Sequence, residues 1–148
     1  MKNILLTFLF LLLIVPAASA QEIGQIKKIT GDVQVERSGR RLPASAGMKV
    51  QAADTVRTGK GGSVGITLSD NTMLSAGPGS VLTLSKYRFD STTHQGELEA
   101  NMRKGTLSMV SGKLAKQSST AVRLKTPTTI IGVRGTEFFV SVEGEGDE

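Results

Sequence analysis

This 148-residue chain contains a single histidine, the residue type that most often serves as a catalytic acid or base. His94 lies in the polar stretch 90–96, next to Thr93 and Gln95. A Ser-His-Asp set needs a serine activated on a sharp turn, and no nucleophile-elbow pattern surrounds this histidine. The chain also has no cysteine, so no zinc-ligand spacing is present. We therefore expect His94 to be a solvated loop residue.

Carboxylates offer the next possible chemistry. Glu97 and Glu99 are two residues apart, so on a strand they share one face, which alternates with apolar residues. That pattern is typical of a solvated strand face rather than of a catalytic pair. Residues 143–148 hold four acids separated by glycines, which favours a flexible acidic tail over a calcium site. The sequence thus predicts no catalytic residue, no metal, no cofactor and no enzymatic activity.

A turn near the C-terminal end carries the best candidate for binding. Arg134 lies between Gly132 and Gly135, where it could grip a carboxylate or a phosphate with both guanidinium nitrogens, and Thr136 could add a second donor. In the alternative interpretation Arg134 pairs with Glu137 or with a backbone carbonyl, and the turn only closes the fold. Arg134, Thr136 and Glu137 are therefore the candidate binding residues.

Two β-rich runs flank this turn. Residues 128–133 are β-branched at five of six positions, and residues 136–142 place Phe138, Val140 and Val142 on one face, which predicts a strand with one buried side. Glycine adopts positive φ without a Cβ clash, so we expect Gly132 and Gly135 to turn or bulge the chain and to display Val133 and Arg134. Pro127, Gly132, Gly135 and Phe138 are the expected structural residues of this segment.

The same segment carries a family resemblance. Residues 126–140, TPTTIIGVRGTEFFV, resemble the closing signature of the FecR domain, and residues 31–35, 46–50, 54–59, 66–74 and 77–84 resemble its earlier blocks in the same order. The resemblance implies an exported, all-β envelope module of stacked, twisted layers with a solenoid-like character. It also implies a protein-binding role, because FecR-type regulators sense an outer-membrane transporter on behalf of a sigma factor. We expect a stand-alone FecR-domain protein here, since no cytoplasmic anti-sigma region precedes the hydrophobic segment.

The N-terminal segment is typical of an export signal. Lys2 precedes an apolar run over residues 4–15, and small residues end at Ala20. Such a run is shorter than the roughly 20 residues that span a bilayer. The sequence predicts a signal peptide over residues 1–20, cleaved after Ala20, a β domain over 21–142 and an acidic flexible tail over 143–148. The protein is then periplasmic or secreted, with no transmembrane segment after cleavage.

Basic residues outnumber acidic ones in the body of the chain. Residues 21–142 contain nine acids and seventeen lysines and arginines, a net charge of +8. A basic surface attracts polyanions, which for an exported protein are anionic glycans or lipids rather than nucleic acid. Scattered basic residues also simply solubilise a β fold and protect its edges. The longest clusters, at 27–28, 40–41 and 103–104, are only pairs.

The apolar pattern predicts ten to thirteen short strands in an all-β single domain, as a twisted sandwich or a compact solenoid. We expect a hairpin-like pair over 23–35 around residues 31–32, and a second hairpin over 64–74 around residues 70–71. Gly105 is expected to turn the chain between strands at 98–102 and 107–109. Residues 113–120 read as polar and mobile, and no helix of useful length is expected.

The leading functional hypothesis is an exported, non-catalytic binding or signalling module that contacts other envelope proteins. The alternative is a polyanion or cell-wall glycan binder that uses the basic body. Salt separates the two hypotheses, because screening weakens binding by scattered charges but affects a docked strand edge much less.

Overall fold

The structure is a computed structural model that describes residues 20–135 and 137–144. The predicted signal peptide up to residue 19, Thr136 and the acidic tail from residue 145 lie outside the described residues. Within these ranges the chain forms twelve strands and one short helix, which confirms the prediction of an all-β single domain. None of the described helices is long and apolar enough to cross a membrane.

The elements follow one another along the chain with short connections. They are β1 (Glu22–Thr30), β2 (Val33–Arg37), β3 (Arg40–Pro43), β4 (Lys49–Gln51), β5 (Thr55–Thr58), β6 (Ser63–Leu68), β7 (Met73–Ala76), β8 (Val81–Phe89), β9 (Gly96–Val110), α1 (Lys113–Gln117), β10 (Val122–Lys125), β11 (Ile130–Gly132) and β12 (Glu137–Val142).

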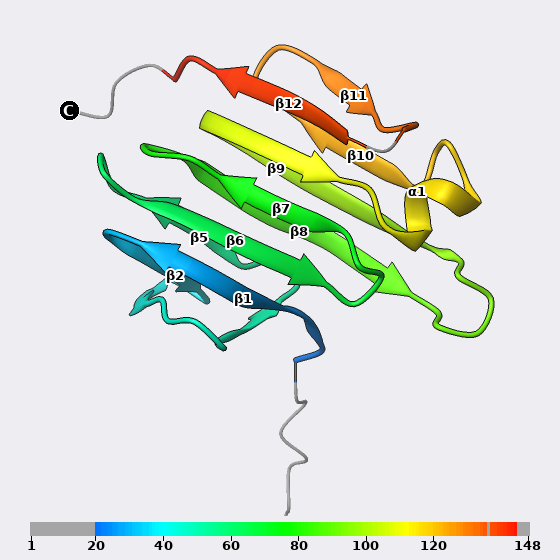
Figure 1. The fold of residues 1–148 in the computed structure, drawn as a ribbon, viewed down its shortest axis with the longest axis horizontal. Helices are drawn as coiled ribbons and strands as arrows, with labels where there is room; N and C mark the ends of the chain where they lie inside the picture. The colour runs from blue at the N-terminus through cyan, green and yellow to red at the C-terminus, as the bar shows by residue number, and fades with distance from the viewer. Residues whose placement is uncertain (1–19, 136, 145–148) are drawn as a thin grey trace, which may run out of the picture.

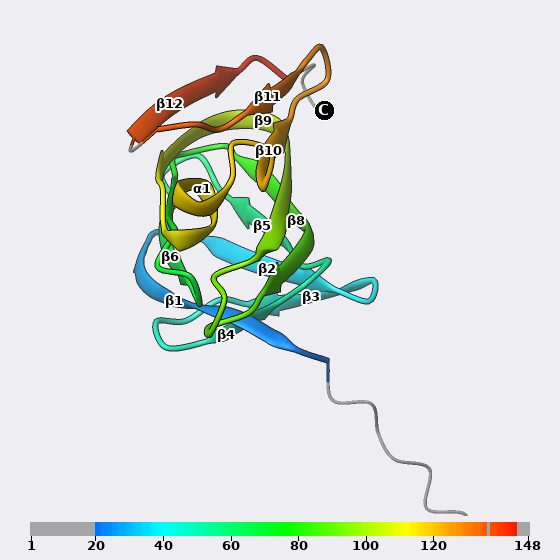
Figure 2. The same cartoon turned by 90° about the vertical axis from the view of Figure 1, so that its right-hand side faces the viewer.

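The strands form one curled sheet whose two halves face each other across the core (Figures 1 and 2). One half contains β1, β4, β6, β7, β12 and the second part of β9, and the other contains β2, β3, β5, β8, β10, β11 and the first part of β9. Strand β10 runs parallel to β9, whereas the other pairs in the described ranges are antiparallel. Alternate residues of both halves point inward and are buried, as the period-2 pattern predicts.

Strand β9 joins the two halves and is continuous over fifteen residues. The predicted turn at Gly105 is therefore wrong. Gly105 instead bends the strand at φ +95°, where a Cβ would collide with Ser80, so only glycine fits this close approach. The buried set changes parity across the bend, from Ala100 and Met102 to Leu107 and Met109, because the strand passes from one half of the sheet to the other.

The two predicted hairpins have different outcomes. Strands β6 and β7 form a hairpin with Asn71 at φ +69°, which confirms the prediction over residues 64–74. The hairpin-like pair over residues 23–35 is wrong, because β1 pairs with β4 and β6 whereas β2 pairs with β3 and β5. Gly31 therefore carries the chain from one half of the sheet to the other instead of folding it back on itself.

Helix α1 overturns the prediction of a polar, mobile segment over residues 113–120. Leu114 is fully buried and Ala115 nearly so, and the helix lies across one end of the space between the two halves of the sheet (Figure 2). A five-residue helix is too short to be stable on its own, so it depends on this packing.

A buried carboxylate fixes the start of α1. Asp70 is completely buried, and its carboxylate accepts hydrogen bonds from the hydroxyls of Thr72 at 2.7 Å and Tyr87 at 3.1 Å. The same carboxylate accepts the backbone N–H of Leu114 at 3.2 Å, and the Asp70 carbonyl accepts the N–H of Lys113 at 2.8 Å. Burial raises the pKa of the Tyr87 hydroxyl, which keeps it protonated as a donor. We call Asp70, Thr72, Tyr87 and α1 the closing cluster.

Candidate binding surface at the edges of strands β11 and β12

Strands β11 and β12 each have one edge without a neighbouring strand in the part of the chain that the structure describes. Strand β11 pairs with β10, and β12 pairs with the second part of β9, where Phe139 lies opposite Ser108. No other strand pairing of either element occurs in the described ranges. Both strands lie at the same side of the molecule, at the top of Figure 1. An unpaired edge presents backbone N–H and C=O groups in the spacing that another strand needs.

The side chains of β12 divide into two sets, as the alternating pattern predicts. Phe138, Val140 and Val142 are half-buried and pack against the core. Phe139 belongs to the opposite set and is 68% exposed. On β11, Ile130 is 63% exposed. Two large apolar side chains on partly unpaired strands thus remain in contact with solvent.

Shallow hollows lie between the two strands. One of about 300 Å³ is lined by Ile131, Phe138 and residues 132–135, and one of about 290 Å³ is lined by Ile131, Val140 and residues 126–129. Both hollows are lined in part by apolar side chains of β11 and β12. We call these two hollows and the free edges of β11 and β12 the open edge.

The turn inside the open edge differs from the prediction in two respects. Val133 is buried and donates its N–H to the carbonyl of Val122 at 3.0 Å, so it is not displayed. Gly132 closes β11 without positive φ, whereas Gly135 has φ +158° and a Cβ built on it would meet open space. Of the two glycines, only Gly135 adopts the positive φ that the sequence led us to expect.

Arg134 projects from this turn into solvent. Arg134 and Glu137 are both exposed, and no ion pair joins them. Across the described ranges the guanidinium of Arg134 has no hydrogen-bond partner at all, so the alternative of an Arg134–Glu137 pair or a backbone bond is not realised. Thr136, the predicted second donor, lies outside the described residues.

Pro127 and Phe138 are the other two residues for which the sequence predicts a structural role. Pro127 lies in the turn closed by a hydrogen bond from the N–H of Thr126 to the carbonyl of Thr129 at 2.8 Å. It is exposed and lines the largest hollow described, of about 550 Å³. Phe138 contributes to the core side of β12.

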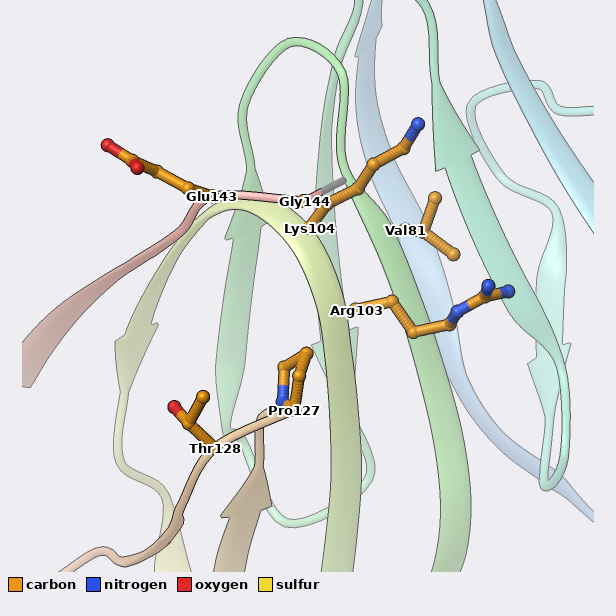
Figure 3. A pocket seen from close by; sticks show the side chains of 7 residues that line it. All are labelled: Val81, Arg103, Lys104, Pro127, Thr128, Glu143 and Gly144. Atoms are coloured by element: carbon orange, nitrogen blue, oxygen red, sulfur yellow. The ribbon is translucent and has the colours of Figure 1, made fainter. Parts of the chain in front are cut away.

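The largest hollow also carries a basic pair. Arg103 and Lys104, adjacent residues of β9, extend to the same side of the strand with Val81 between them, while Thr128 and Glu143 lie on the other side of β9 (Figure 3). The sequence identified 103–104 as one of three basic pairs but gave no sign that β9 bends there and brings both side chains beside the open edge. The bend is a tertiary feature, set by the packing of Gly105 on Ser80.

Several other charged residues are neutralised within the sheet. Arg37 contacts Asp54 at 2.7 Å, Arg57 contacts Glu36 at 3.0 Å and Lys125 contacts Glu99 at 3.0 Å. The carboxylate of Asp54 also accepts the N–H of Gln51 at 2.8 Å. The hydrogen bond from Lys125 lowers the pKa of Glu99. Glu99 thus acts as the partner of a cation on a neighbouring strand.

The histidine considered for catalysis packs beside an aromatic ring. His94 stacks on Phe89 with ring centroids 6.0 Å apart, in the loop after β8. Among the described residues no group of three or more acidic or histidine side chains could hold a metal ion. The candidate binding surfaces in the described residues are therefore the open edge and the hollow lined by Arg103 and Lys104 beside it, which we call the basic hollow.

Three comparisons with known proteins gave one family match and one similar solved structure. A family model described as FecR protein matches residues 54–148. A solved structure described as a cell surface anchoring domain is 33% identical over 42% of this chain and 83% of its own length, with a TM-score of 0.41. No curated protein matches the chain.

Proposed function

We propose that this chain, which belongs to the FecR protein family, is an envelope-associated binding module that acts through protein contacts and has no catalytic activity of its own. After cleavage behind Ala20 it would work in the periplasm or at the cell surface. The observation that carries the proposal is the open edge, because it combines free strand edges with exposed apolar side chains. We therefore propose that the site that contacts other proteins lies on β11 and β12.

The open edge can bind a strand of another protein through its backbone and its apolar side chains. Each free edge offers N–H and C=O groups that a partner strand can pair with, and Phe139 and Ile130 offer apolar surface next to them. Backbone pairing gives affinity with little dependence on the partner's sequence, and the hollows beside Phe138 and Val140 select its side chains. Arg134, which is exposed to solvent just before the start of β12, adds a preference for an acidic residue in the partner.

A second candidate function uses the basic hollow. Arg103 and Lys104 extend together from β9, and the body of the chain carries a net charge of +8. Paired cations suit a phosphate or carboxylate of an anionic glycan or lipid. Glu143 on the opposite wall lowers the attraction for an anion, which is why we rank this function second.

Capture from envelope extract at low and at high salt tests both functions. We expect a protein partner that stays bound at high salt, where the screening length falls to about 3 Å at 1 M, and that is lost with Phe139→Ser. Arg103→Gln serves as the matched variant for the basic hollow. Capture that disappears at high salt and depends on Arg103, but not on Phe139, would instead establish polyanion binding and contradict the leading proposal.

A further inference from the structure

We infer that the free edge of β12 is also an interface between two copies of this chain, in which the β12 strands of both copies pair in antiparallel fashion across a two-fold axis. This inference does not rest on the proposed function, because it concerns the purified protein alone. It starts from the residues of β12, Glu137–Val142, and from the charges at the two ends of the strand.

The alternation of side chains restricts how β12 can pair with itself. Opposite residues of an antiparallel pair lie on the same face of the sheet, so exposed positions must meet exposed positions. A two-fold axis between identical strands therefore passes midway between one residue and the same residue of the second copy. The possible centres within the strand are Phe138, Phe139 and Val140.

Of these centres, Phe139 gives the best complementarity. It places Phe139 opposite Phe139 on the outer face, Glu137 opposite Ser141, and Phe138 opposite Val140 on the inner face. Aromatic pairs directly across an antiparallel ladder are stabilising. A centre at Val140 would put Glu137 opposite Glu143, which brings two carboxylates together, and a centre at Phe138 would pair fewer residues of the strand.

The ends of β12 are complementary in charge. Arg134 precedes the strand and Glu143 follows it, and both are exposed. Antiparallel pairing brings the start of one β12 strand beside the end of the other, so Arg134 of one copy lies at the end of the interface that carries Glu143 of the second copy. The exposed guanidinium of Arg134, which makes no hydrogen bond or ion pair in the described ranges, thus faces an opposite charge at each end of the interface.

The inner side of β12 also has room for side chains of a second copy. The half-buried side chains Phe138 and Val140 line the hollows of about 300 and 290 Å³ on the inner side of the edge. An added strand that continues the sheet brings its own Phe138 and Val140 over these hollows. The two exposed Phe139 rings cover each other on the outer side.

Charge replacement at Phe139 tests the interface. The native protein should show twice the monomer mass in light scattering as its concentration is raised. Phe139→Lys and Phe139→Glu each put like charges opposite one another, so each variant alone should stay monomeric at every concentration. An equimolar mixture of these two variants should recover the dimer. Ile130→Lys is the matched control, because Ile130 is similarly exposed on the neighbouring strand and should leave the dimer intact.

Disulfide trapping tests the register, since the chain contains no cysteine of its own. Phe139→Cys should cross-link to itself on mild oxidation, because residues directly opposite have Cβ atoms about 5 Å apart. Ile130→Cys should remain uncross-linked. Melting curves like that of the native protein establish that each variant is folded.

Three results would overturn the interface. The first is a native protein that stays monomeric over the whole concentration series. The second is a mixture of Phe139→Lys and Phe139→Glu that does not associate, and the third is equal dissociation by Ile130→Lys. If the pure protein is monomeric but Phe139→Lys loses a protein captured from extract, the edge of β12 serves a foreign strand, and the proposed function survives without the dimer.

Discussion

The closing cluster and the open edge differ in how their polar groups are hydrogen-bonded. In the closing cluster, the carboxylate of Asp70 is fully buried and accepts bonds from Thr72, Tyr87 and Leu114. At the open edge, β12 has a strand partner on one side only within the described residues, and Phe139 is exposed. The first region has its hydrogen bonds satisfied internally, and the second retains backbone groups that hydrogen-bond to water until another chain pairs with them.

This difference separates residues that hold the fold together from residues that are free to contact a partner. Buried donors around Asp70 cannot turn to water when their acceptor is removed, so substitutions there lower the free energy of unfolding. Outward side chains of β12 already contact water, so substitutions there leave the fold intact and change association. The predictions below measure how sharp this separation is.

Asp70→Ala should have the largest effect on the free energy of unfolding. It leaves buried donors of Tyr87, Thr72 and Leu114 without an acceptor, at a total cost of about 4 kcal/mol. Denaturant unfolding measures this loss. Asp90→Ala is the matched control, because Asp90 caps an exposed loop and its removal should cost much less. Equal losses for both variants would contradict the role of the closing cluster.

Tyr87 should make the closing cluster sensitive to high pH. Burial raises the pKa of Tyr87 in the folded state above the unfolded value of about 10, so the unfolded chain releases this proton first. The contribution of the Tyr87 hydroxyl to the free energy of unfolding is therefore complete below pH 10. It is lost as the pH rises above 10, at up to about 1.4 kcal/mol per pH unit. Tyr87→Phe should remove this dependence. A native protein and a variant whose unfolding curves shift in parallel above pH 10 would refute it.

Neighbouring phenylalanines of β12 should behave differently. Phe138 packs partly against the core, and Phe138→Ala should cost about 2 kcal/mol, less than for a fully buried ring. Phe139→Ala should change the free energy of unfolding by no more than about 0.5 kcal/mol. Thermal melting of the two variants under conditions that keep the protein monomeric distinguishes them. A larger loss for Phe139 would show that the open edge is covered within one chain.

The glycines of the turn should give the smallest differences. Gly135→Val introduces a β-branched residue at φ +158°, which should cost about 1 kcal/mol even though no atom obstructs the new side chain. Gly132→Val meets only the Ser119 carbonyl, at 4.0 Å, without positive φ, and should be close to neutral. Melting temperatures compare the two, and a greater loss at Gly132 would contradict this assignment.

Local patterns in the sequence were sufficient to predict the pairing of strands where the partner strand is close in the chain. The hairpin of β6 and β7 follows from alternating residues around Asn71, whose short polar side chain tolerates positive φ. The inward and outward sets of β12 follow from its alternation in the same way. Exposed Phe139 could be found from this pattern, because it is an aromatic residue on the polar face.

Long-range contacts explain what the sequence did not predict. Helix α1 begins where its Leu114 N–H meets Asp70, 44 residues earlier, and no local capping residue marks that start. Gly105 looks like a turn residue, but the close approach of Ser80 makes it a bend in a continuous strand. Likewise, the pairing of β1 with β4 and β6 depends on strands that follow it at a distance, so the glycine at position 31 suggested a hairpin that does not form.

Amide hydrogen exchange of β12 tests the central contrast most directly. Alternate amides of β12 face away from β9, and we expect them to exchange rapidly in dilute protein and to become protected when the protein is concentrated or when its partner is added. The Leu114 amide, bonded to buried Asp70, should stay protected throughout. Protection of the outward β12 amides that is already complete in dilute protein, or that neither concentration nor a partner changes, would contradict the assignment of this edge as a binding surface.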